Sequence, residues 1–307
     1  MTGIYNYRNA LPDADWADES VRRQVADVFN EVSLKDQEFP LWQISGAHNQ
    51  NVFEDVMHDD LLGIRPHMVG GVLKELCDSG HFGTRDDVGG WISKLDEQLA
   101  EAFLRFCDYS NESGLSHSHG LFTHLQLTLT RTSDAPIIKA KAKNVEVISR
   151  WLAHEALQVQ DTPYRRVRAM ALQSFNDFYQ LLSDTKCPNF RLTEAQAISL
   201  EEIRQKMLLG FHFLSKTNLE SNVNIYRLPP KFHKMDELMR RSIRTRISPS
   251  LMWTFVLEHE MGIAGRLVGH LHAGSSSRRA VERWLIAFWS DLVYREPGAD
   301  APLPLSL

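Results

Sequence analysis

Two histidines placed two positions apart, His270 and His272, are the residues of this sequence best suited to catalysis. On a β-strand, side chains at i and i+2 point to the same face, so these two imidazoles would face one metal ion. Glu258 precedes them in an apolar stretch, and a turn near Ile263 would place its carboxylate on the same face. Two imidazoles and a carboxylate suit Mg²⁺, Mn²⁺ or Zn²⁺. The pattern predicts a metal site made of Glu258, His270 and His272, and surface or structural histidines are the alternative interpretation of the pair taken alone.

The elements that would position this site are predicted to be a small antiparallel sheet and several helices. Residues 251–274 contain two apolar runs around glycines, which is the pattern of a β-hairpin. Leucine and threonine alternate in residues 121–132, which predicts a further strand, and residues 222–228 predict a short one. Apolar residues at helical spacing predict helices over about 86–106, 139–158, 164–184 and 194–215, the last with the form of a capping box at 199–202.

The predicted fold class is therefore α+β, with a mostly helical N-terminal region followed by a small antiparallel sheet that carries a long helical insertion. Residues 1–119 would form an acidic helical domain, and residues 120–297 an α+β domain with the helical insertion at about 139–218. The proline-rich residues 298–307 would be a flexible tail.

The order of these motifs resembles the HUH endonucleases of rolling-circle replication initiators and relaxases. His270-Leu271-His272 matches the family's pair of histidines around a bulky residue, and Leu127-Thr128-Leu129-Thr130 matches an upstream strand of replication initiators. Glu258 matches the acidic residue of the strand before the histidine pair. The resemblance covers roughly residues 121–294.

This resemblance implies a metal-dependent protein that nicks and joins single-stranded DNA, with Mg²⁺ or Mn²⁺ as cofactor. A tyrosine would attack the scissile phosphate and form a covalent phosphotyrosine. Tyr294 is the tyrosine after His272 and is the predicted nucleophile, although Pro297 stands where the family commonly has lysine. Tyr5 and Tyr7 lie near the start of the chain, where relaxases carry their tyrosines.

A basic stretch predicts DNA binding independently of the resemblance. Residues 227–246 contain seven basic and two acidic side chains. Its basic members are Arg227, Lys231, Lys234, Arg240, Arg241, Arg244 and Arg246. Basic groups neutralise phosphates, and the nearby Tyr226 and Phe232 would stack on bases. A second basic region contains Lys139, Lys141, Lys143, Arg165, Arg166 and Arg168, for which a solvated helix face is the alternative interpretation.

Charge and composition limit the remaining classes of function. Residues 1–101 contain 19 acidic and 8 basic side chains, whereas the rest of the chain contains 20 acidic and 26 basic ones. This asymmetry favours a protein partner for the acidic region, and two solvated surfaces of different sign are the alternative interpretation. No apolar run is long enough to span a membrane, and three scattered cysteines favour the cytoplasm. Phosphate-binding loops and a serine-hydrolase elbow are missing from the sequence.

Three hypotheses follow. The first is the HUH-type nicking protein. The second is a non-catalytic, mostly helical binding or scaffold protein that recognises DNA or protein through residues 227–246. The third is a metalloenzyme that acts on a small molecule with Glu258, His270 and His272. His117, His119 and His124 also have a spacing suited to metal binding. A polar loop is the favoured interpretation there, because Ser118 is not the bulky residue of the HUH pattern and no strand with an acidic residue precedes it.

Overall fold

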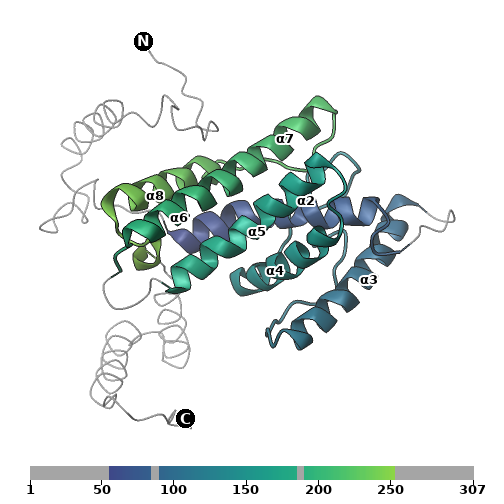
Figure 1. Ribbon diagram of the computed structural model, residues 1–307. Helices are drawn as coiled ribbons and strands as arrows, with labels where there is room; N and C mark the ends of the chain where they lie inside the picture. The colour runs from purple at the N-terminus through teal and green to yellow at the C-terminus, as the bar shows by residue number, and fades with distance from the viewer. Residues whose placement is uncertain (1–54, 84–89, 185–189, 253–307) are drawn as a thin grey trace, which may run out of the picture. The chain divides into compact units, whose positions relative to one another are not determined.

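The computed structural model describes residues 55–83, 90–184 and 190–252, and 69% of these residues are helical (Figure 1). The chain divides into two compact units, Met1–Trp253 and Thr254–Leu307, and every described residue belongs to the first. The described elements are η4 (Met57–Ile64), α2 (Arg65–Asp78), α3 (Trp91–Glu112), α4 (Ala142–Gln158), α5 (Pro163–Asp184), α6 (Glu194–Arg204), η5 (Gln205–Leu209), α7 (Gly210–Glu220), α8 (Lys231–Thr245) and η6 (Pro249–Met252).

Helices α4 and α5 form the centre of this part of the chain and pack closely against each other. Helix α2 packs on α4, and α7 and η5 pack on α5, while α6 bridges α5 and α8 (Figure 1). The apolar face of each helix points into the shared core, as on α3, where Leu95, Leu99 and Phe106 are buried at helical spacing. Burial of these faces holds the helices together.

The predicted helices are confirmed, and local sequence signals explain where several of them begin and end. Pro163 opens α5, at a helix position where proline is well tolerated. The capping box, however, lies at Thr193 and Gln196, six residues before the predicted one. The Thr193 hydroxyl accepts from the Gln196 backbone N–H, and the Gln196 side chain accepts from the Thr193 backbone N–H in return. The left-handed backbone of Arg246 ends α8.

The predicted antiparallel sheet is wrong for the residues that the structure describes, because they form helices and turns with only an isolated bridge between Arg191 and Ile247. Residues 121–132 form successive turns in which the backbone N–H of Leu129 donates to His124 O. Thr128 has a left-handed backbone, with φ of 56°. The Asp134 carboxylate accepts from the Thr130 backbone and hydroxyl, which holds the turn.

The two remaining predicted strands have different outcomes. Residues 222–228 form a loop between α7 and α8 rather than a strand, although Tyr226 and Leu228 are buried at a spacing of two, because this segment forms no β-bridge among the described residues. Residues 253–274 of the predicted hairpin lie outside the described residues. The α+β class therefore has no support within the described ranges, whose architecture is all-helical apart from that single bridge.

Candidate functional site

The predicted metal and catalytic residues, Glu258, His270, His272 and Tyr294, all lie outside the described residues. Within the ranges that the structure does describe, no three His, Cys, Asp or Glu side chains converge in a way that would hold a metal ion. The strand that the HUH resemblance requires at residues 127–130 is replaced by turns. The resemblance therefore loses its upstream strand, and its metal site and nucleophile stay predictions.

Several members of the first basic stretch are part of the fold. Lys231 Nζ donates to the backbone oxygen of His58 at 2.7 Å, and Arg246 Nη1 donates to that of Thr193 at 3.1 Å. Arg240 Nε donates to Asp236 Oδ1 at 3.2 Å. On the same helix Lys234 and Arg241 are half-buried, whereas Arg244 is exposed. The seven charges of this stretch are therefore not equally available to a ligand.

Asp236 is the centre of a buried ionic network that joins α6 to α8. Arg204 Nη1 donates to Asp236 Oδ1 at 2.5 Å, and the Arg204 guanidinium also pairs with Glu201. Burial raises the pKa of Asp236, and the charges of Arg204 and Arg240 oppose that rise. This network gives Arg240 of α8 a structural role beside a buried carboxylate, and that role requires no nucleic acid.

The aromatic residues near this stretch cannot stack on bases. Tyr226 and Phe232 are 2% and 1% exposed, respectively, and their rings pack against Phe211. Stacking on a nucleic-acid base requires an accessible ring face. This part of the sequence-based interpretation is wrong, and contact with the phosphate backbone is what remains.

Internal ion pairs also neutralise half of the second basic region. Lys143 pairs with Glu146 at 2.8 Å. Further along the chain, Arg165 pairs with Asp161 at 2.8 Å, and Arg168 pairs with the Glu75 carboxylate at 3.1 Å. Within the described part of the chain, the members of the two basic stretches that are exposed and have no ion pair are Lys139, Lys141, Arg166 and Arg227.

Three of these cations lie in two segments that border the N-terminal half of α2. Segment 136–141 carries Lys139 and Lys141, and it is attached to α2 because the Ile138 N–H donates to Pro66 O at 3.2 Å. Segment 226–228 carries Arg227, and the ring of its Tyr226 fills the space above Gly71 of α2. We call Lys139, Lys141 and Arg227 the basic surface.

His67 lies on α2 at this same place. Burial, together with the positive charge of Arg227, lowers the pKa of His67 to about 4. Its ring atom Nδ1 is buried and has no hydrogen-bond partner among the described residues. The positive charge of Arg227 thus adds to burial in disfavouring the imidazolium form of His67.

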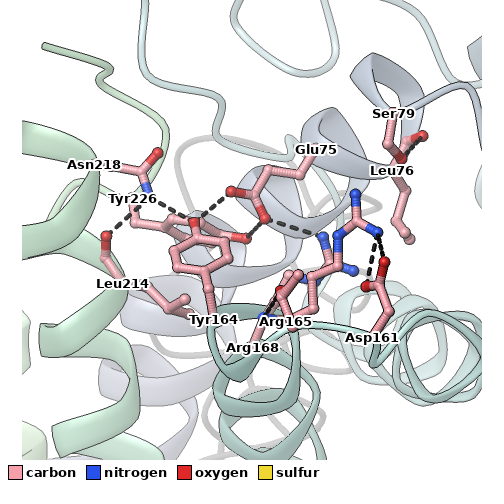
Figure 2. Close-up of polar contacts among 11 residues, drawn as sticks. Glu75, Leu76, Ser79, Asp161, Tyr164, Arg165, Arg168, Leu214, Asn218 and Tyr226 are labelled. Atoms are coloured by element: carbon pink, nitrogen blue, oxygen red, sulfur yellow. Dashed lines mark hydrogen bonds and ion pairs between the residues drawn. The ribbon is translucent and has the colours of Figure 1, made fainter. Parts of the chain in front are cut away.

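A half-buried network around Glu75 fixes the segment that carries Arg227 (Figure 2). The Glu75 carboxylate accepts hydrogen bonds from the hydroxyls of Tyr164 and Tyr226, the latter at 2.7 Å, and pairs with Arg168. Asn218 Nδ2 in turn donates to the Tyr164 hydroxyl at 2.6 Å. The network links α2, α5, α7 and the loop before α8, which holds the residue before Arg227 in place.

The chemistry of this network does not suit a tyrosine nucleophile. Burial raises the pKa of the Tyr164 and Tyr226 hydroxyls, and the nearby negative charge of Glu75 raises it further. Both phenols therefore stay protonated at neutral pH and serve as hydrogen-bond donors.

Gly71 gives a direct test of this anchoring, because a methyl group there would lie only 2.4 Å from Cε1 of Tyr226. Tyr226 is buried and bound to Glu75, so its ring has no free space to move into. We expect Gly71→Ala to lower the free energy of unfolding in urea by about 1–3 kcal/mol, although alanine is the better helix former. The control is Gly120→Ala, where a methyl group meets no atom within 4 Å and the residue lies outside the helices. Equal stability of the two variants would contradict the described packing.

The other histidines have structural surroundings. His124 Nδ1 lies 2.7 Å from Asp96 Oδ2, and the His119 ring packs against Phe122 at 5.2 Å. The polar-loop interpretation agrees with the irregular backbone of residues 115–120. Sequence reasoning missed His67 and Glu75, and the signal that could have pointed to them is the Gly70-Gly71 pair inside a helix, which indicates close approach of another segment.

An open groove of about 470 Å³ lies between α5 and α6 among the described residues. Its charged lining consists of Asp177, Asp184, Glu202 and Lys206. Three carboxylates against one ammonium make this groove unsuited to a phosphate-containing ligand.

No described helix is both long enough and apolar enough to cross a membrane. Comparison with known proteins identifies no matching family, no similar curated protein and no similar solved structure.

Proposed function

We propose that this chain is a non-catalytic, mostly helical DNA-binding protein that contacts the phosphate backbone through the basic surface. The observation that carries the proposal is the position of Lys139, Lys141 and Arg227, which are exposed, have no ion pair among the described residues and lie in two segments bordering one helix. Free cations on a protein surface bind DNA by releasing the counterions that are condensed on its phosphates.

One observation favours binding without base-specific recognition. The aromatic side chains near the basic surface are buried, so the available groups are cations that contact phosphate. Phosphate contacts fix the position of a protein on DNA but do not select its sequence. We therefore expect similar affinity for duplexes of unrelated sequence. A cytoplasmic location, and a protein partner for the acidic residues 1–101, are part of the proposal.

The metal-dependent nicking activity stays a prediction that no described residue supports. Its upstream strand is replaced by turns, and its metal ligands and tyrosine lie outside the described ranges. The two functions differ in a simple assay. A binding protein is indifferent to EDTA, whereas a nicking protein forms a covalent adduct with single-stranded DNA in Mn²⁺ that is lost in a His270→Ala/His272→Ala variant.

The salt dependence of binding tests the proposed function. If the three cations each neutralise one phosphate, they contribute about −2.7 to the slope of log affinity against log salt concentration. Raising the salt concentration from 50 to 200 mM then lowers the binding constant about 40-fold through these three contacts. We expect a Lys139→Ala/Lys141→Ala/Arg227→Ala variant to lose about this much of the slope in fluorescence anisotropy titrations of a labelled duplex.

The matched control removes three positive charges from elsewhere on the described surface. Arg165, Lys206 and Lys216 are each paired with a carboxylate one helical turn away. Their triple alanine variant has the same net charge as the Lys139→Ala/Lys141→Ala/Arg227→Ala variant, because both lose three positive charges. We expect its slope to equal that of the wild type. Equal slopes for all three proteins would show that the basic surface does not bind DNA.

A further inference from the structure

The open groove between α5 and α6 takes no part in the proposed contact with DNA. Leu181 and Ile203 contribute apolar side chains to its lining, and Asp177, Asp184 and Glu202 contribute carboxylates. A lining of this kind suits lysine and arginine, whose stems are apolar and whose ends carry a positive charge. The groove therefore matches basic side chains that come from another molecule.

Most of the negative charge in the groove is not neutralised by the fold. A glutamine one turn before each of Asp177 and Asp184 donates to its Oδ1, at 2.8 Å and 2.9 Å, so both carboxylates are held in place by neutral groups. Neither aspartate forms an ion pair within the described ranges. Lys206 Nζ lies 3.5 Å from Glu202 Oε2. A cleft lined mainly by one sign of charge attracts ligands of the opposite sign, here cations.

The exposed face of α5 continues beyond the groove and changes in character along the helix. Met170 precedes Asp177 by seven residues, and Asp184 follows it by seven, so the three side chains lie on one face of α5. Met170 is 40% exposed, and Arg166 is exposed one turn before it. This face is thus apolar or cationic toward the start of α5 and acidic toward its end.

Helix α7 adds a second exposed apolar side chain, Phe213, beside the start of α5. Helices α6 and α7 both pack along α5 (Figure 1). The Phe213 ring is 44% exposed, and its centroid lies 6.4 Å from that of Tyr164. One turn earlier Gly210 lets α7 approach α5 closely, because a methyl group there would lie 2.8 Å from Ala171 Cβ and 3.8 Å from Met170 Cε. We call Met170, Phe213 and the groove together the docking surface.

We propose that the docking surface binds a basic amphipathic helix of a partner protein, whose apolar residues contact Met170 and Phe213 and whose lysines or arginines enter the groove. A helix that lies along neighbouring helices presents anchors at positions i, i+3 or i+4, and i+7. Between Met170 and Asp184, α5 rises about 21 Å, so the bound segment has about four turns. The docking surface shares no residue with the basic surface, and the inference therefore does not depend on DNA binding.

The experiment measures how tightly the full chain binds two labelled, alanine-based helical peptides of about 16 residues. Each carries leucines on one half of a single face and lysines on the other half, and the two peptides differ in which half comes first. We expect fluorescence anisotropy to show that at least one of them binds. Replacing Asp177→Asn, Asp184→Asn and Glu202→Gln together keeps the size of the side chains and should weaken that binding about tenfold.

The matched control removes three carboxylates from exposed positions of α3. The Glu97→Gln/Asp108→Asn/Glu112→Gln variant has the same net charge as the groove variant. A general attraction between an acidic protein and a basic peptide would weaken equally in both variants. Binding in the groove predicts less than a twofold effect for the α3 variant, and equal effects in the two variants would contradict the inference.

The apolar half of the docking surface has its own test. Phe213→Ala should weaken binding of the peptide by about fivefold or more, because truncation of an aromatic anchor removes much of the contact. Leu104→Ala alters an apolar side chain of α3 that is 59% exposed and should have no effect. If Phe213→Ala lowers the stability in urea, Met170→Ala replaces it. Unchanged affinity in the apolar variants would contradict the proposed helix contact.

Other occupants of the groove give different results, and each would overturn the inference. A wild type that binds neither peptide, or that binds glutamate versions of the peptides as tightly, has no site for a basic helix. Sedimentation that shows a dimeric wild type and a monomeric groove variant would assign the groove to a second copy of the chain. Calorimetric binding of Ca²⁺ that the groove variant loses would assign it to a metal ion. The salt dependence of DNA binding is measured separately, so failure here leaves the proposed function standing.

Discussion

Replacing Asp60 with alanine is expected to lower the free energy of unfolding by about 3–5 kcal/mol, because it leaves the guanidinium of Arg65 buried without its carboxylate. Both side chains are fully buried. Arg65 Nε donates to Asp60 Oδ1 at 2.9 Å, and Nη2 donates to Asp60 Oδ2 at 2.5 Å and to Phe175 O at 2.7 Å. The guanidinium also lies over the rings of Phe175 and Tyr179. Equilibrium unfolding in urea measures the loss.

Two further variants show that the expected loss comes from an unpaired charge. Asp78→Ala removes a carboxylate from a partly exposed pair with Lys74 and is expected to cost less than about 1 kcal/mol. Burial raises the pKa of Asp60 and Arg65 only opposes that rise, so the pair itself is costly to bury. Asp60→Leu combined with Arg65→Met should therefore recover most of the stability. If Asp60→Ala costs no more than Asp78→Ala, the buried pair does not hold this region.

The helical part of the fold could be predicted because its signal is local. The apolar residues of α5 recur at helical spacing, and a proline opens the helix, so its bounds follow from neighbouring residues. Helix α4 is predicted for the same reason. Both helices then pack against each other through the faces that the spacing had identified.

Residues 121–132 show why an alternating pattern is weaker evidence. Leu127 and Leu129 are buried, as a strand would have them, but they are buried by turns. A period of two reports which side chains face the core and does not report where the backbone hydrogen bonds go. The missed signal was Asp134, whose carboxylate accepts from the backbone N–H groups of Thr130 and Arg131.

The candidate site could be predicted only in part for a related reason. The sequence shows every cation, and it also shows partners one turn away, such as Asp161 for Arg165. It does not show that Arg168 pairs with Glu75, 93 residues distant, or that Arg227 lies beside His67. Which cations remain free is decided by these long-range contacts, and so is the position of the basic surface.

Replacing Trp151 with alanine is the second substitution with a large expected effect. Its indole is fully buried, and its ring centroid lies 5.7 Å from that of Phe82 and 5.9 Å from that of Phe122. Its Nε1 donates to Glu155 Oε1 at 3.1 Å, and the other oxygen of this carboxylate lies 2.6 Å from His81 Nε2. We expect the cavity to lower the free energy of unfolding by about 3–5 kcal/mol, and Glu155 Oε1, left without its hydrogen-bond donor, to lower it further.

Trp151→Phe and Leu157→Ala separate the contributions to this loss. Trp151→Phe keeps an aromatic ring but removes the hydrogen bond to Glu155, so we expect an intermediate loss. Leu157 is 49% exposed on the same helix, and its replacement by alanine is expected to change the stability by about 0.5 kcal/mol or less. A Trp151→Ala variant as stable as Leu157→Ala would contradict the aromatic core.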